Sequence, residues 1–283
     1  MSGWPRRRAS ACVRGTSVAR AARMDFNRFA ASLFAVLSIM AVTSAASAQP
    51  AASSAPPPPP LWDVQVGASF VGTSGNSDTA TTGADFTTNR RGKVWQIEGA
   101  ASAVRTATDD VTTAERYLAL GRAQRALTPM IGVTSGEKLE HDPFAGLDLR
   151  SILDLGLSWT LIHRPSWTLD GLTSIAWLHE SHTTEAGIDD PIGVLQLRSK
   201  IPFGAGAETT QRFTYYPNFD TASAYRSEAE ITAQATMTGH LALKFGYLVR
   251  YSNAPVTGFK KTDVTTTASI VLRWKAAAAA PAP

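Results

Sequence analysis

Apolar residues occupy every second position along residues 145–161, interrupted only by Ser151. The apolar parity comprises Ala145, Leu147, Leu149, Leu153, Leu155, Leu157, Trp159 and Leu161. A period of two predicts a strand with one apolar and one polar face. Strands of soluble sheets usually span about 5–6 residues, whereas a strand tilted across a bilayer needs about 9–11. The length of this pattern therefore predicts a membrane-spanning strand.

Shorter versions of the same alternation recur along residues 61–275, among them residues 62–73, 225–237 and 264–274. Counting the segments between turn signals predicts about twelve strands, within a range of ten to fourteen. Single-chain bacterial barrels have an even number of strands. No stretch of these residues reaches the roughly 18 consecutive apolar residues of a membrane helix. The predicted fold is all-β, a transmembrane antiparallel up-and-down barrel.

The connections between the predicted strands alternate in length. Longer loops are expected at residues 179–191, 216–223 and 252–261, and the intervening turns are short. Outer-membrane barrels have short periplasmic turns and longer outer loops. With this orientation the aromatic residues form two belts at the lipid–water boundaries. The inner belt is Trp62, Trp95, Trp159, Trp167 and Trp274, and the outer belt is Trp177, Tyr215, Tyr225 and Tyr251.

Closure of the barrel would place the polar parity around a lumen, because an open sheet edge in lipid leaves backbone groups unpaired. The charged residues expected to line it are Glu98, Arg122, Asp148, Arg150, Asp154, Asp170, Arg198, Lys200, Glu208, Arg212, Arg226, Glu228, Glu230, Lys244, Arg250 and Arg273. Charges of both signs in a narrow tube are expected to pair. Two hypotheses follow: the pairs leave a narrow path for small solutes or ions, or they plug the tube.

The N-terminal 60 residues have the composition of targeting and spacer segments. Residues 1–23 carry six arginines and precede a second methionine, so we interpret them as a mis-assigned extension or a basic leader. Residues 24–48 have the layout of a secretory signal peptide, with cleavage expected after Ala48. Residues 49–60 form a Pro/Ala-rich linker, and residues 276–283 form an Ala/Pro tail.

Export changes the charge of the chain. Seven of the 27 Lys and Arg residues but one of the 23 Asp and Glu residues lie in residues 1–48, so the exported chain has a net charge near −2 rather than +4. A nucleic-acid partner is therefore not expected. The only cysteine, Cys12, is removed with this segment, which excludes disulfides and thiolate chemistry.

Two stretches carry a family resemblance. Residues 72–86, GTSGNSDTATTGADF, contain a Gly75-Asn76-Ser77-Asp78 turn, and residues 135–150, SGEKLEHDPFAGLDLR, place Glu140, Asp142, Phe144, Leu147 and Arg150 at a characteristic spacing. Over residues 61–274 the chain resembles the salt-induced outer-membrane proteins, also called domain of unknown function 481. The resemblance implies an outer-membrane barrel of Gram-negative bacteria without an established activity, and a link to salt or osmotic stress. In this chain an Ala/Pro tail follows the terminal aromatic Trp274.

A membrane-embedded lipase is the enzyme alternative. His179 and Ser181 lie two residues apart, a spacing that resembles outer-membrane phospholipases, and a nucleophile needs its base within hydrogen-bond reach. Because no asparagine follows nearby to orient the histidine, we interpret both as polar residues entering an outer loop. His179 and His182 with Glu180 or Glu185 form a weak zinc pattern, since positions three apart face opposite sides of a strand.

Two acidic pairs, Asp109-Asp110 and Asp189-Asp190, are expected on outer loops, either as solvated carboxylates or as sites for divalent cations near lipopolysaccharide. We expect a non-enzymatic envelope protein without a cofactor. Its expected partners are outer-membrane lipid, lipopolysaccharide and the barrel-assembly machinery. A lipid hydrolase and a structural or adhesion barrel are the alternative functions.

Overall fold

The computed structural model describes residues 61–73, 79–204 and 206–276. The expected extension, signal peptide, linker and most of the Ala/Pro tail lie outside the described residues, as does the turn at residues 75–78. In the described part of the chain, no helix is long and apolar enough to cross a membrane.

Twelve strands form the structure, joined at one place by a short 3-10 helix, η2, at Pro143–Ala145. The strands are β1 (Trp62–Thr73), β2 (Thr79–Arg91), β3 (Trp95–Thr108), β4 (Val111–Ala126), β5 (Ile131–Asp142), β6 (Leu147–Arg164), β7 (Trp167–His182), β8 (Ile188–Phe203), β9 (Ala207–Tyr216), β10 (Arg226–Thr236), β11 (Leu241–Ser252) and β12 (Thr262–Ala276).

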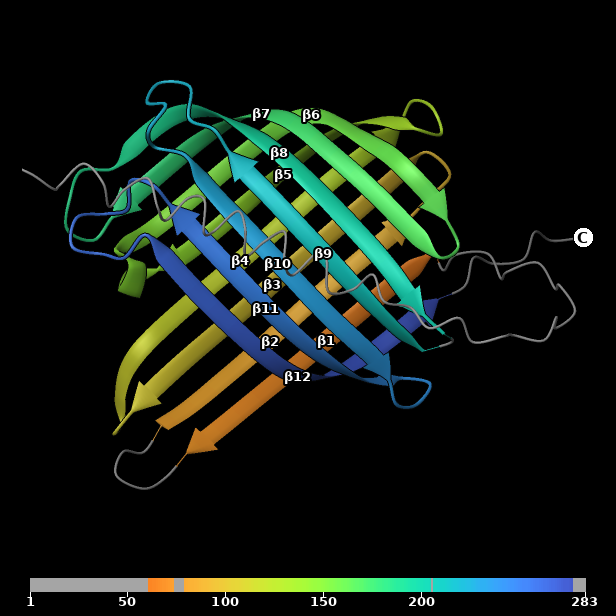
Figure 1. Cartoon of the computed structure of the whole chain (residues 1–283), viewed down its shortest axis with the longest axis horizontal. Coiled ribbons are helices and arrows are strands. Elements are labelled where there is room, and N and C mark those ends of the chain that lie inside the picture. Colours follow the sequence, from red (N-terminus) through yellow and green to blue (C-terminus); the bar gives the residue numbers. More distant parts are fainter. Residues whose placement is uncertain (1–60, 74–78, 205, 277–283) are drawn as a thin grey trace, which may run out of the picture. The chain divides into compact units, whose positions relative to one another are not determined.

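Each strand pairs antiparallel with its neighbours in the chain, and β1 pairs with β12 to close the barrel (Figure 1). At this seam Arg273 donates two hydrogen bonds to the Asp63 carboxylate, from Nε at 3.1 Å and from Nη2 at 2.5 Å. Closure leaves no strand edge unpaired, as a bilayer requires. The predicted twelve-stranded antiparallel barrel is therefore confirmed.

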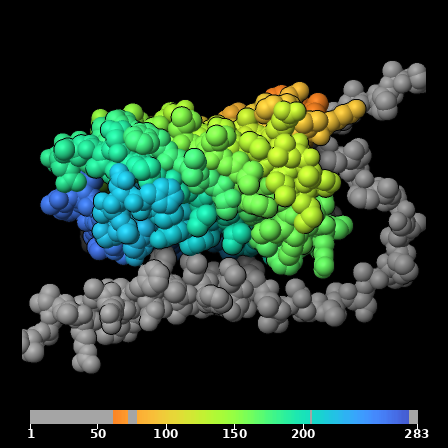
Figure 2. Space-filling view, turned by 90° about the horizontal axis from the view of Figure 1, so that it is seen from above, coloured from red at the N-terminus to blue at the C-terminus, as the bar shows by residue number. Residues whose placement is uncertain are grey.

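The exterior of the barrel is apolar. The outward parity of β6 exposes Leu153 and Leu155, each by more than half of its surface, and β7 and β12 do the same with Ile175 and Ile270. In the space-filling view of Figure 2, side chains from successive parts of the barrel lie next to one another on the face shown. Soluble monomers rarely expose contiguous apolar patches beyond a few hundred Å². This surface therefore indicates a barrel that spans a membrane.

The two ends of the barrel differ. One end, which we call the terminus end, carries Leu61 and Ala276 and the short turns after β2, β4, β6, β8 and β10. The opposite end, which we call the loop end, carries the longer connections at residues 217–225 and 253–261. The loop expected at residues 179–191 is shorter than predicted, because β7 continues to His182 and β8 begins at Ile188.

The expected aromatic belts follow these ends. At the terminus end the Arg90 guanidinium lies 5.7 Å from the ring centre of Trp62, and that of Arg125 lies 6.0 Å from the ring centre of Trp95. At the loop end the rings of Tyr215, Tyr225 and Tyr251 form a row with centre-to-centre distances of 5.9 and 6.0 Å.

Candidate functional site

Contacts between strands that are not neighbours identify the lumen. Arg250 on β11 lies 2.8 Å from Glu140 on β5, and Lys138 on β5 lies 2.5 Å from Glu228 on β10. In a closed barrel such side chains can meet only through the interior. The polar parity of these strands therefore faces inward.

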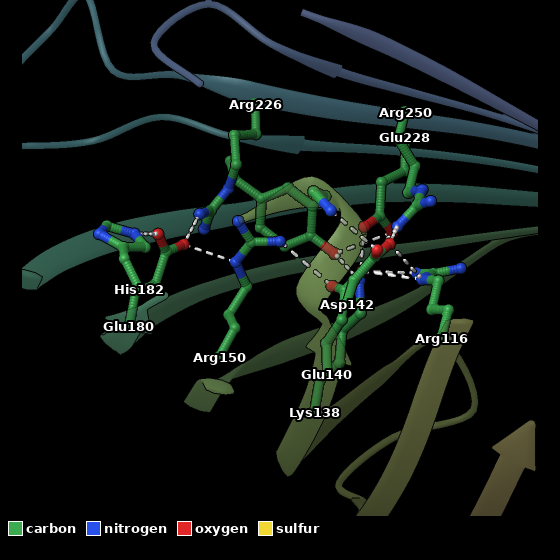
Figure 3. A network of polar contacts seen from close by, with 12 residues as sticks. Arg116, Lys138, Glu140, Asp142, Arg150, Glu180, His182, Arg226, Glu228 and Arg250 are labelled. Atoms are coloured by element: carbon green, nitrogen blue, oxygen red, sulfur yellow. Dashed lines mark hydrogen bonds and ion pairs between the residues drawn. The ribbon is translucent and has the colours of Figure 1, made fainter. Parts of the chain in front are cut away.

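Glu140 lies at the centre of these contacts. Its side chain is 1% exposed and makes ion pairs with Arg116 at 2.8 Å, Arg150 at 3.2 Å and Arg250 at 2.8 Å. The three guanidinium groups come from β4, β6 and β11, so they approach from both sides of the barrel (Figure 3). A buried carboxylate is stable only when it is paired and hydrogen-bonded in this way.

Asp142 extends the cluster toward the loop end. It lies 3.3 Å from Arg250 and 3.8 Å from Arg116, and its carboxylate also accepts a hydrogen bond from the backbone N–H of Ala145 at 3.1 Å. The hydrogen bond from Ala145 caps η2. One carboxylate therefore connects the lumen charges to the turn between β5 and β6.

Glu180 forms a second centre on β7. Its side chain is 5% exposed, accepts a 2.5 Å hydrogen bond from Arg150 Nε, and makes an ion pair with Arg226 from β10. His182 Nε2 lies 3.0 Å from the other carboxylate oxygen. Arg150 contacts both Glu140 and Glu180, so it joins the two centres.

Lys138 on β5 and Glu228 on β10 complete the arrangement with an ion pair across the lumen. The Tyr216 hydroxyl donates to Glu228 at 3.3 Å, and Lys138 Nζ lies 3.4 Å from the same hydroxyl. We call the whole set the outer ion-pair network, shown in Figure 3, and define it as Arg116, Lys138, Glu140, Asp142, Arg150, Glu180, His182, Arg226, Glu228 and Arg250.

The outer ion-pair network crosses the lumen. It joins β5 to β10 and β11, and it joins β7 to β10, across the interior. An apolar cluster of Ile152, Leu172, Leu178, Ile192 and Val194 also faces inward, on β6, β7 and β8, and is buried. The half of the lumen toward the loop end, which we call the outer half, therefore contains paired charges and buried apolar side chains.

The half of the lumen toward the terminus end, which we call the inner half, contains separate ion pairs. It holds Arg122 with Asp154 at 2.6 Å, and more exposed pairs such as Lys200 with Glu208 at 2.7 Å. Further pairs there are Arg198 with Glu98, Arg212 with Glu230, Lys244 with Asp85, and Arg273 with Asp63. Asp170 shares the inward parity of β7 and lies opposite Arg198 in the strand register.

The connection between β11 and β12 reaches across the loop end. A Cβ added to Gly146 would lie 2.6 Å from Phe259 Cε2 and 2.9 Å from Val256 Cγ1. Thr257 also donates a 3.1 Å hydrogen bond to Glu185, in the connection between β7 and β8. Residues 253–261 therefore pack against connections from the opposite wall at the loop end.

The structure places one expected lumen residue elsewhere. Asp148 is 63% exposed, because a β-bulge between Leu147 and Leu149 interrupts the alternation. Leu147, expected on the lipid side, is buried instead. The sequence interpretation of both residues was wrong, since it assumed an unbroken period of two.

The candidate metal and cation sites do not converge. His179 is exposed, whereas His182 is buried against Glu180, and the described residues contain no cluster of three metal-ligating side chains. Asp189 contacts His179, and Asp190 accepts a hydrogen bond from Asn218, so this pair lies in β8 and not in a loop. Asp109 and Asp110 both have positive φ, 50° and 64°, which is typical of the tight turn that joins two strands of a hairpin.

The family described as "Protein of unknown function, DUF481" matches residues 66–274. The chain belongs to this family. The expected resemblance is therefore confirmed. No curated protein matches the chain.

Solved structures similar to this DUF481 protein include three barrels. The NanC porin is 12% identical over 75% of this chain and 97% of its own, with a TM-score of 0.42. An outer-membrane channel from Pseudomonas putida F1 is 13% identical over 81% and 100%, with a TM-score of 0.47. The translocator domain of autotransporter NalP from Neisseria meningitidis is 8% identical over 90% and 97%, with a TM-score of 0.41. At these identities and TM-scores the similarities assign no substrate and no role.

Several residues of the DUF481 barrel were missed in the expected lumen set, namely Asp63, Asp85, Arg116, Lys138, Glu140, Asp142, Glu180 and His182. The alternation of β5 contains the necessary signal, because Gly132, Thr134, Gly136, Lys138, Glu140 and Asp142 share one parity. Glu140, Asp142 and Arg150 also belong to the spacing that carried the family resemblance. All three are members of the outer ion-pair network.

Proposed function

We propose that this DUF481 protein is an outer-membrane barrel that is closed at rest and passes small solutes through a narrow path when the outer ion-pair network opens. The observation that carries the proposal is the set of ion pairs across the lumen, Glu140 with Arg250 and Lys138 with Glu228. A structural barrel needs no charged groups across its interior, because apolar packing of similar volume is often at least as stable. Charges of both signs favour weak selectivity between anions and cations.

An outer-membrane location is supported by the apolar exterior, the closed sheet and the predicted signal peptide. The longer connections at the loop end then face the outside. Contacts with lipopolysaccharide and with the barrel-assembly machinery, and a role in salt or osmotic stress, stay predictions from the sequence.

Conductance in a planar bilayer tests the proposal. We expect the purified exported protein to show rare, small steps, and the Glu140→Gln/Glu228→Gln double variant to show frequent ones. Glu208→Gln serves as the control, because its closest ion pair, with Lys200 at 2.7 Å, joins neighbouring strands near the terminus end, and its contact with Arg273 across the lumen is longer, at 4.0 Å. If all three proteins stay silent, the proposal fails and a structural or adhesion barrel is the better interpretation.

A further inference from the structure

Three polar side chains lie on the lipid-facing side of the barrel near the loop end. His179 and Ser181 share the outward parity of β7, and Asp189 on β8 is the register partner of His179. His179 Nδ1 lies 2.7 Å from Asp189 Oδ1, and both side chains are about half exposed. Glu180, between the two β7 residues, faces the lumen, so the barrel wall separates this set from the outer ion-pair network.

The arrangement has the order of a nucleophile, a base and an orienting carboxylate. A carboxylate on Nδ1 fixes the imidazole tautomer in which Nε2 can accept a proton. Ser181 lies two positions along the strand from His179, about 6.6–6.8 Å between Cα atoms, and on the same face. Asp189 supplies the orienting group that an asparagine would otherwise provide.

The Ser181 hydroxyl has a weak competing partner. It lies 3.4 Å from Asp148 Oδ2, which is longer than the 2.5–3.0 Å typical of O–H···O hydrogen bonds. The proposed reaction requires the hydroxyl to leave Asp148 and turn toward His179 by rotation about the Cα–Cβ bond. The bulge in β6 is what brings Asp148 to this outer face.

An apolar hollow of about 450 Å³ lies on the same outer face, over β1 to β6. Small side chains, Ala101, Ala103 and Ala119, form its floor, and larger ones such as Phe86 and Leu149 form its rim. Five strand spacings of about 4.8 Å give it a length of about 24 Å. With the tilt usual for membrane barrels it descends through roughly one leaflet of the bilayer.

The strand register connects this hollow to the three polar side chains. One outward row passes through Val66, Phe86, Ala101, Ala119, Leu139, Ser151, His179 and Asp189. In the adjacent row, Leu149 at the rim of the hollow is the register partner of Ser181. An extended chain lying in the hollow therefore ends beside the serine and the histidine.

We propose that this outer face is a hydrolytic site for an ester-linked acyl chain of a membrane lipid. The acyl chain lies in the hollow, which faces hydrocarbon, and its ester carbonyl reaches Ser181 at the polar boundary. A soluble ester lacks the long chain that would occupy the hollow.

The chemistry uses water as the only other reactant. Ser181 Oγ attacks the ester carbonyl carbon while His179 Nε2 takes the hydroxyl proton. The ester C–O bond then breaks, and His179 returns the proton to the departing alcohol. A water molecule, deprotonated by His179, then attacks the acyl carbonyl carbon, the bond to Ser181 Oγ breaks, and His179 returns the proton to Ser181 Oγ. The products are a fatty acid and the lipid alcohol. Asp189 is a positioning residue, because it acts through the imidazole.

Labelling of the full-length exported protein in detergent tests the nucleophile. We expect a long-chain fluorophosphonate to modify Ser181, as located by peptide mass spectrometry, and Ser181→Ala to abolish both labelling and fatty-acid release from phosphatidylethanolamine vesicles. His179→Ala should lower the rates of Ser181 labelling and of fatty-acid release about 10²–10⁴-fold. Ser199→Ala, an outward-facing serine near the other end of the barrel, is the control that should keep both. Labelling at Ser151, or no labelling at all, overturns the proposal.

Asp189 is tested by comparing two replacements. We expect Asp189→Asn to lose most labelling of Ser181, and Asp189→Glu, which keeps a carboxylate for Nδ1, to recover it. Equal labelling in both variants would contradict the positioning role.

The hollow is tested by filling it. Ala101→Trp should reduce cleavage of a long-chain ester about tenfold or more and leave cleavage of a short-chain ester unchanged. Ala268→Trp, on the outward parity of β12 and outside the hollow, is the matched control. An equal loss for both esters would contradict an acyl-chain site, and all folded variants are checked by their heat-dependent gel mobility.

Discussion

At the scale of single residues, Glu140 has the clearest expected effect. Glu140→Gln removes the negative charge that pairs with Arg116, Arg150 and Arg250 and leaves three guanidinium groups close together in a confined space. Breaking a buried ion pair typically costs about 3–5 kcal/mol, so we expect the free energy of unfolding in detergent to fall by about this amount. A urea titration measures the difference.

Glu208→Gln is the matched comparison for this stability measurement. Its partner Lys200 is partly exposed, and ion pairs in contact with water contribute about 0–1 kcal/mol. Equal losses for the two variants would show that the deep burial of Glu140 has no energetic consequence.

The same residues show how far sequence reasoning reaches. The parity of a residue follows from its position along the strand, so Arg150, Asp154 and Arg250 could be assigned to the lumen in advance. The partner of a residue across the barrel depends on how the strands are staggered around the closed sheet. The contact of Glu140 with Arg250, 110 positions away, could therefore not be read from the alternation.

At the scale of elements, the connection at residues 253–261 acts together with Gly146. This glycine has φ +77°, and the aromatic ring of Phe259 occupies the space where a side chain would lie. Gly146→Val should displace the connection from the mouth and raise the frequency of conducting steps in a planar bilayer. Limited proteolysis should then cut within residues 253–261 faster than in the original protein.

Gly204 provides the control for backbone strain. It also has a positive φ, +59°, but an added Cβ meets nothing within 4 Å. Gly204→Val should therefore lower the free energy of unfolding by about 1–3 kcal/mol through backbone strain, as expected also for Gly146→Val. It should leave conductance unchanged. If both variants conduct alike, the packing of Phe259 on Gly146 does not control the mouth.

The β-bulge at Leu147–Leu149 marks the limit of prediction at this scale. A bulge inserts one extra residue and moves the following side chains to the opposite face. The residues around Asp148 carry the same alternation as the rest of β6, and the interruption arises where η2 turns the chain into that strand. Strand existence was therefore predictable from periodicity, whereas the face of Asp148 was not.

At the scale of the whole molecule, the orientation in the outer membrane can be measured. The exported chain has no cysteine if Cys12 is removed with the signal peptide, so single cysteines can be introduced in a Cys12→Ser background. We expect Thr257→Cys, in the connection between β11 and β12, to react with a membrane-impermeant maleimide on intact cells. Gly239→Cys, in a turn at the terminus end where an added Cβ meets nothing within 4 Å, should react only after the cells are opened. This expectation follows from the asymmetry of outer-membrane barrels, which have short periplasmic turns and longer extracellular loops. The reverse labelling pattern would invert the barrel, and with it both the outer position of the ion-pair network and the leaflet that the lipid-ester site faces.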